Sequence, residues 1–252
     1  MMKKIIIDRL RQIEKEEKID ILFAVESGSR AWGFPSTDSD YDVRFIYKRK
    51  INDYLKIQPM DDFIDFKITD DLDFKAWDIQ KVLRLILKSN YSISEYLQSP
   101  IHYIVNDRFE KDLLELVSSQ FNARKVSAHY LGITTKKLIE IENSEMLKLK
   151  SLFYALRSVL SALWIVEKRT IPPMEFKDLV VLIEKENILS KIKSYWKTKE
   201  KVDESYLINK DEELINWILK LKSELKEKVE EIPTIEFDKA RVDEFFIKTI
   251  GE

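Results

Sequence analysis

The spacing of hydrophobic residues changes near residue 107. Before that point it alternates between strand and helix periods, and after it the apolar positions recur at helical spacing almost throughout. The first part predicts a helix over 2–18, strands over 19–25, 41–48, 63–68 and 72–77, and a helix over 79–88. The second part predicts helices near 108–119, 122–144, 146–167, 173–186, 211–230 and 238–249, with a loop near 198–210. We therefore expect an α+β fold with a mixed N-terminal domain over 1–107 and an all-α domain over 108–252.

Charge and composition narrow the possible functions. The chain has 43 basic and 45 acidic residues, so a strongly basic nucleic-acid wrapper and an acidic tail are both excluded. It has no cysteine and only two histidines, so any metal site must depend on carboxylates. The apolar runs are too short for a membrane span, and the N-terminus is too charged for a signal peptide. We expect a cytoplasmic protein without a membrane partner.

Glycine is rare in this sequence, and its placement points to one window. The chain has 4 glycines among 252 residues, whereas glycine makes up roughly 7% of an average protein, so a chain of this length would usually hold about four times as many. Gly28 and Gly33 lie close together between two predicted strands. This placement indicates an unusual backbone conformation or the close approach of a ligand.

The same window holds the candidate chemistry. Ser27, Gly28 and Ser29 end a predicted buried strand and offer backbone N–H groups and hydroxyls to phosphate oxygens. Asp40 and Asp42 follow at the start of the next strand, where residues i and i+2 point the same way. Two carboxylates this close favour a cation between them, and carboxylate ligands suit Mg²⁺ or Mn²⁺. The pattern indicates a nucleoside triphosphate and phosphoryl-type chemistry.

Other motifs for phosphate or metal do not fit. The sequence has no P-loop and no dinucleotide-binding glycine motif. The acidic run that begins at Asp38 has Val43 and Arg49 where a calcium-binding EF-hand needs glycine and glutamate. Arg44 shares the face of Asp42, where it either pairs with a carboxylate or contacts the substrate.

A family resemblance follows from these residues. Gly28-Ser29, a ten-residue spacer and Asp40-Tyr41-Asp42-Val43 resemble the signature of the polymerase-β-like nucleotidyltransferase superfamily. Further segments resemble its RNA-ligase-associated branch, which is linked to RNA repair. They lie at 72–83, 88–90, 95–100, 149–157, 164–165 and 172–176. Ala76, Tyr91 and Tyr96 depart from that branch without removing a metal ligand.

The resemblance implies the roles of particular residues. It implies a nucleotidyltransferase fold with a small mixed sheet flanked by helices, and a helical domain that closes over the nucleotide. It also implies a third carboxylate beside Asp40 and Asp42. The candidates are Asp65, Asp71, Asp73 and Asp78, of which Asp73 matches best and Asp78 suits a helix cap. Asp40, Asp42 and Asp73 would hold two Mg²⁺ or Mn²⁺ ions, and Asp73 would be a candidate general base.

The remaining predicted site residues would bind the nucleotide. Gly28 and Ser29 would hold phosphate oxygens, and Lys81 is our first choice to neutralise the pyrophosphate. Lys150 and Arg157 lie about two turns apart on one predicted helix and could reach the nucleotide, with Tyr154 stacking on its base. The further candidates for nucleotide contact are Arg30 and Ser39.

The identity of the acceptor stays open at the level of the sequence. The reaction implied is transfer of a nucleoside monophosphate from an NTP to an acceptor hydroxyl, with release of pyrophosphate. An RNA end is the acceptor that the branch suggests. A small molecule or a protein hydroxyl is an alternative, and so is a non-catalytic nucleotide-binding or antitoxin-like regulatory module. The three carboxylates favour an enzyme over that module.

Overall fold

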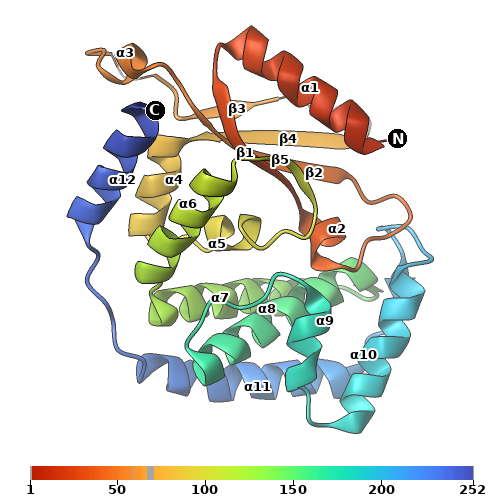
Figure 1. Ribbon diagram of the computed structural model, residues 1–252. Helices are drawn as coiled ribbons and strands as arrows, with labels where there is room; N and C mark the ends of the chain where they lie inside the picture. The colour runs from red at the N-terminus through yellow and green to blue at the C-terminus, as the bar shows by residue number, and fades with distance from the viewer. Residues whose placement is uncertain (1, 59, 67–70, 252) are drawn as a thin grey trace. The chain divides into compact units, whose positions relative to one another are not determined.

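The computed structural model describes residues 2–58, 60–66 and 71–251 and divides the chain into two compact units (Figure 1). Unit 1 comprises Met1–Ala31, Asp40–Gln120 and Glu236–Glu252, and unit 2 comprises Trp32–Ser39 and Phe121–Ile235. This division differs from the predicted domains 1–107 and 108–252. The difference arises because the helix after residue 106 packs against the sheet and the last helix packs against helices of unit 1, whereas residues 32–39 pack with the helices of unit 2.

Unit 1 is built on a mixed β-sheet, which confirms the predicted fold class. Among the described residues it has five strands in the order β3-β4-β2-β1-β5. Strands β2 and β4 are parallel, and the other neighbouring pairs are antiparallel. The strands are β1 Asp20–Ser27, β2 Tyr41–Lys48, β3 Phe63–Asp65, β4 Leu72–Asp78 and β5 His102–Val105.

Two differences from the predicted strands concern the edges of this sheet. Strand β5 was not predicted, because its four residues are too few to show a period of two. The predicted strand over 63–68 is observed as β3 Phe63–Asp65, and residues 67 and 68 lie outside the described residues.

Helix α1, Met2–Glu17, covers one face of the sheet (Figure 1). Its apolar stripe of Ile6, Leu10 and Ile13 is fully buried in one hydrophobic cluster with Val43 and Phe45 of β2. Because side chains alternate along a strand, Asp42 and Arg44 point to the opposite face. The helices that flank the sheet in unit 1 also include α4 Ile79–Leu87, α5 Ser92–Tyr96, α6 Asp107–Ser119 and α12 Lys239–Gly251, with the short helices α2 Gly28–Trp32 and α3 Ile51–Tyr54 in the connections.

Unit 2 is helical and is organised around α8, Leu149–Lys168. This helix is long and apolar enough to cross a membrane, but 83% of that stretch is buried within the protein, as in the core helix of a globular unit. It packs most extensively against α7. The other elements of unit 2 are α7 Ala123–Glu142, α9 Phe176–Leu179, the 3₁₀ turn Val180–Leu182, α10 Glu186–Lys199, α11 Glu212–Glu230 and the paired short strands β6 Leu147–Lys148 and β7 Leu207–Ile208.

The predicted helix over 173–186 is wrong. Its place is taken by α9 and the 3₁₀ turn Val180–Leu182, and Ile183 after the turn has an extended backbone. Helix α10 follows and was not predicted, because only Ile188 and Ile192 mark its apolar face among charged residues. The sequence also suggested that residues 197–231 form a solvated surface, yet Lys199 is 1% exposed.

Residues 32–39 lie between the end of α2 and the start of β2 and are anchored in unit 2. Phe34 is fully buried, with its ring centroid 5.2 Å from that of Phe153 and 5.4 Å from that of Phe176. Lys199 donates a 2.7 Å hydrogen bond from Nζ to Oγ of Ser36. The chain therefore leaves unit 1 after Ala31 and returns at Asp40.

Candidate functional site

The sheet brings two of the three predicted catalytic carboxylates together. Asp42 of β2 and Asp73 of β4 are register partners on parallel strands, so their side chains lie on the same face. The Nη2 atom of Arg44 donates to Oδ1 of Asp42 at 2.7 Å and to Oδ2 of Asp73 at 2.8 Å. Nζ of Lys75 lies 3.4 Å from Oδ2 of Asp73. The site thus combines two carboxylates with two cations, and Arg44 is the residue that joins the strands.

Gly28 lies directly against Asp42. It has a φ of +62°, in the left-handed region that glycine adopts without strain. A Cβ atom built on Gly28 would lie 2.0 Å from Oδ2 of Asp42, far inside contact distance. The glycine therefore allows the carboxylate of Asp42 to approach the turn after β1, and its positive φ is the unusual backbone conformation that the placement of glycine indicated.

Arg30 and Asp40 connect this turn to the start of β2. Nε of Arg30 donates to the backbone oxygen of Asp40 at 3.1 Å, and its guanidinium lies 3.9 Å from the centroid of the Tyr41 ring. Asp40 itself is exposed, whereas Ser29 is buried. The described contacts of Arg30 thus hold the backbone next to the carboxylates.

The corner of the sheet where β2 and β4 begin holds Asp42 and Asp73, and its oxygen donors fit a divalent cation. Asp42 and Asp73 offer carboxylate oxygens from adjacent strands, which suit Mg²⁺ or Mn²⁺, and Asp40 lies two residues before Asp42. Within the residues described, however, no three acidic or histidine side chains are gathered into one group that could hold a metal ion. In this arrangement the positive charge between Asp42 and Asp73 comes from Arg44.

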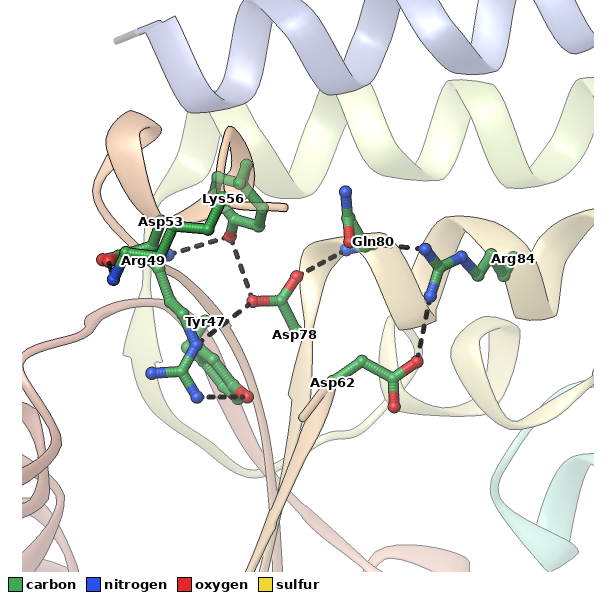
Figure 2. A network of polar contacts seen from close by, with 9 residues as sticks. Tyr47, Arg49, Asp53, Lys56, Asp62, Asp78, Gln80 and Arg84 are labelled. Carbon is green, nitrogen blue, oxygen red and sulfur yellow. Dashed lines mark hydrogen bonds and ion pairs between the residues drawn. The ribbon is translucent and has the colours of Figure 1, made fainter. Parts of the chain in front are cut away.

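The far end of β4 holds two other residues that the sequence singled out. Oδ1 of Asp78 accepts from the backbone N–H of Gln80 at 2.8 Å, which confirms Asp78 as the N-cap of α4 (Figure 2). Nζ of Lys81 lies 3.6 Å from Asp62 and 4.1 Å from the ring centroid of Phe63. Lys81 is also near Trp77, which is four residues or about 13 Å along the strand from Asp73. The structure therefore does not bring Lys81 to the carboxylates.

Unit 2 holds the other predicted nucleotide-binding residues, Ser39, Lys150, Tyr154 and Arg157. Glu204 pairs with Lys150 and accepts a 3.0 Å hydrogen bond from Ser39. The Tyr154 ring meets Trp32 edge-on with centroids 5.1 Å apart, and the guanidinium of Arg157 lies 4.4 Å from the Trp32 centroid. Within unit 2 the four residues thus share a small polar and aromatic cluster, and their contact with a nucleotide stays a prediction.

Two residues of the corner were not among the predicted set. Lys75 was passed over because an exposed lysine on a short strand has no distinctive sequence signal. Glu26 is fully buried next to the Ser27-Gly28-Ser29 turn. A signal existed for Glu26, since an acidic residue that directly follows the apolar run Ile21–Val25 of a buried strand requires a buried partner.

A mixed sheet with paired carboxylates beside a glycine turn is consistent with a nucleotidyltransferase of the polymerase-β type, and the comparison with protein families supports this class. The model of the RNA repair pathway DNA polymerase beta family matches residues 2–248. The chain belongs to this family.

Two individual proteins are also similar to the chain. The uncharacterized protein YcgL of Bacillus subtilis (strain 168) is 42% identical over 179 residues, which cover 71% of this chain and 69% of that protein. A solved nucleotidyltransferase-like protein from Exiguobacterium sibiricum 255-15 overlaps with 97% of this chain and 79% of its own, at 12% identity and a TM-score of 0.32. So loose an overlap adds nothing to the assignment.

Proposed function

We propose that this chain transfers a nucleoside monophosphate from an NTP to a hydroxyl at the end of an RNA strand, with release of pyrophosphate. The observation that carries the proposal is the register pair of Asp42 and Asp73, with Gly28 packed against the first carboxylate. Membership in a family described as an RNA repair pathway polymerase supports the reaction class and the choice of acceptor.

The proposed roles combine the register pairing of Asp42 and Asp73 with the roles that the family resemblance implies. Asp42 and Asp73, with Asp40, would hold divalent cations, which when bound would neutralise the triphosphate and lower the pKa of the attacking hydroxyl. The turn at Gly28 and Ser29 binds the β- and γ-phosphate oxygens. The acceptor oxygen bonds to the α-phosphorus while the bond to the pyrophosphate breaks, and Asp73 takes up the hydroxyl proton.

Arg44 and Lys75 have a separate role in this proposal. Their positive charges lie within 3.4 Å of Asp73, so they offset the repulsion between neighbouring carboxylates. Arg44 also donates to the backbone oxygen of Asp73 at 2.8 Å, which fixes the spacing of the two strands. These contacts keep both carboxylates in place before substrate binds.

The first test is transfer of label from each α-³²P-labelled NTP, with Mg²⁺ or Mn²⁺, to an RNA oligonucleotide that ends in a free 3′ hydroxyl. A DNA oligonucleotide of the same sequence, the protein itself and hydroxyl-bearing small molecules are offered in parallel. Asp42→Asn and Asp73→Asn are expected to abolish transfer. Asp20→Asn is the matched control, because Asp20 is an exposed aspartate at the opposite end of the sheet in unit 1.

Label that enters RNA alone, and is lost in both site variants, supports the proposal. Label that enters DNA, the protein or a small molecule instead would keep the reaction and replace the acceptor. An RNA acceptor should also bind more weakly as salt rises, because its binding releases counterions from the phosphate backbone. Absence of label in every arm, with intact protein, contradicts the proposed activity.

A further inference from the structure

Glu26 is a buried acidic residue that the proposed reaction does not use. Its relative exposure is 0%, and it lies opposite Val43 in the register of β1 and β2. It thus points to the α1 face of the sheet, away from the face that carries Asp42 and Arg44. A carboxylate in such a place needs hydrogen bonds to offset the loss of water.

Glu26 obtains these hydrogen bonds from two other segments of unit 1. Oε1 accepts from the backbone N–H of Asp42 at 2.8 Å, and Oε2 accepts from the hydroxyl of Tyr103 on β5. The backbone of Glu26 is held as well: its N–H donates to Ile101 at 2.9 Å and its oxygen accepts from Ser99 at 2.7 Å. Four hydrogen bonds therefore fix one residue, and one of them ends on the amide of a proposed catalytic residue.

The chain on either side explains why this bond matters. Two residues after Glu26, Gly28 touches the Asp42 carboxylate. Glu26 holds the amide of Asp42 from one face of the sheet, and the Gly28 turn meets its carboxylate on the other. The distance between the turn and the start of β2 thus depends on the Glu26 side chain.

We propose that Glu26, oriented by Tyr103, is a positioning residue that sets the Asp42 carboxylate against the Gly28 turn. This inference rests on the proposed nucleotidyl transfer, in which Asp42 acts directly. Burial raises the pKa of Glu26 above its ordinary value, and the bonds from Tyr103 and from the Asp42 amide oppose part of that rise.

The test compares four single variants. Glu26→Ala removes the acceptor, and Glu26→Gln keeps an oxygen for the Asp42 amide. Tyr103→Phe removes the donor to Glu26 without changing the shape of the ring. Tyr47→Phe is the matched control, because Tyr47 is another buried tyrosine in the same hydrophobic cluster and contacts Arg49 instead.

Two readouts are measured for each variant. The first is kcat and KM for the NTP, and the second is the hydrogen-exchange rate of the Asp42 amide, read by NMR relative to the Phe45 amide on the same strand. Glu26→Ala is expected to lower kcat about 100-fold with a smaller change in KM, since a misplaced catalytic group costs this much. Its Asp42 amide is expected to exchange at least about tenfold faster.

Glu26→Gln is expected to retain most of the kcat and the slow exchange of the Asp42 amide. For Tyr103→Phe we expect values of both quantities between those of Glu26→Gln and Glu26→Ala.

Equal kcat and equal Asp42 exchange in Glu26→Ala and wild type would overturn the proposal. If Glu26→Ala does not fold, the isosteric Tyr103→Phe decides, and behaviour identical to Tyr47→Phe would count against the proposal. If wild type transfers no nucleotide, the proposed function fails, whereas amide exchange still reports whether Glu26 holds Asp42.

Discussion

Strand β4 carries an aspartate near each end, and the two differ in their nearest donors. Asp73 is bonded to side-chain cations, Arg44 and Lys75, at the corner where β2 and β4 begin. Asp78 accepts its short hydrogen bonds from neutral groups, the Gln80 amide (Figure 2) and, at 3.0 Å, the Tyr54 hydroxyl, while Nε of Arg49 lies 4.0 Å away. The side chain of Asp78 is 4% exposed. Burial is the largest cause that raises the pKa of Asp78. The donors, rather than the residue type, separate a candidate catalytic carboxylate from a structural one.

The largest expected effect is on turnover at the Asp73 end. Asp42→Asn and Asp73→Asn each keep the side-chain volume but remove a charge that the reaction needs. Each should lower nucleotidyl transfer by at least about 10³-fold, with the melting temperature little changed. Initial rates and thermal unfolding of the same samples test this. If either variant kept more than a tenth of wild-type activity, the assignment of Asp42 and Asp73 to catalysis would be contradicted.

The next effect concerns the close approach of Gly28 to Asp42. Gly28→Ala places a methyl group where the Asp42 oxygen lies and also forces a non-glycine residue to a φ of +62°. We expect about a 100-fold loss of transfer and a loss of about 1–2 kcal/mol in the free energy of unfolding.

Gly132→Ala is the matched control for Gly28→Ala. Gly132 lies within α7, and a Cβ there has nothing within 4 Å. This variant should keep full activity and gain up to about 1 kcal/mol in the free energy of unfolding, because alanine is the better helix former. Equal losses in both glycine variants would show that contact with Asp42 is not the cause.

The Asp78 end should respond in stability rather than turnover. Asp78→Ala removes the cap of α4 and the acceptor of Tyr54, and should cost about 1–3 kcal/mol in the free energy of unfolding. Transfer measured well below the melting temperature should stay within about threefold of wild type. Denaturant unfolding and initial rates distinguish the two outcomes.

The pH dependence of stability provides a related test at Asp78. Burial raises the pKa of Asp78 in the folded protein above its ordinary value, so the folded state binds the proton more tightly than the unfolded state. Wild type should therefore gain stability relative to Asp78→Asn as pH falls from 7 through the raised pKa, and the gain should level off below about 3.9. A relative loss on acidification would contradict the assigned direction.

The smallest expected effect is at Lys81. Its charge lies beside Asp62 at the Asp78 end, so Lys81→Ala should change transfer by less than about threefold and stability by less than about 1 kcal/mol. Arg44→Gln at the other end is the comparison and should lower transfer strongly. A large loss in Lys81→Ala would restore the sequence-based prediction that Lys81 neutralises the pyrophosphate.

The sequence predicted those parts of the fold whose signals are local. The alternation over 41–48 and the stripe of Ile6, Leu10 and Ile13 depend only on neighbouring residues, and β2 and α1 match them closely. Asp78 was identified as a cap for the same reason. The pairing of Asp42 with Asp73 follows from the register of two parallel strands, which a family motif suggested and which periodicity alone does not specify.

The parts that were missed depend on distant contacts. Phe34 lies in a segment of turn-forming residues, and only the aromatic core of unit 2 shows where it packs. Lys199 looked like a surface residue because its partner, Ser36, is far away in the sequence. Lys81 looked close to the carboxylates because helix and strand are adjacent in sequence, whereas the full length of β4 separates them.

The interleaving of the two units has a consequence for synthesis on the ribosome. Strands β1 to β5 emerge early, but unit 1 also includes Glu236–Glu252, which follows the whole of Phe121–Ile235. At typical elongation rates, the sheet waits on the order of 10 s for its last helix. During that time α4 lacks α12, one of the elements it packs against in the finished protein. The unit that begins first is therefore completed last, and a stalled chain would contain an unfinished unit 1 and a complete unit 2.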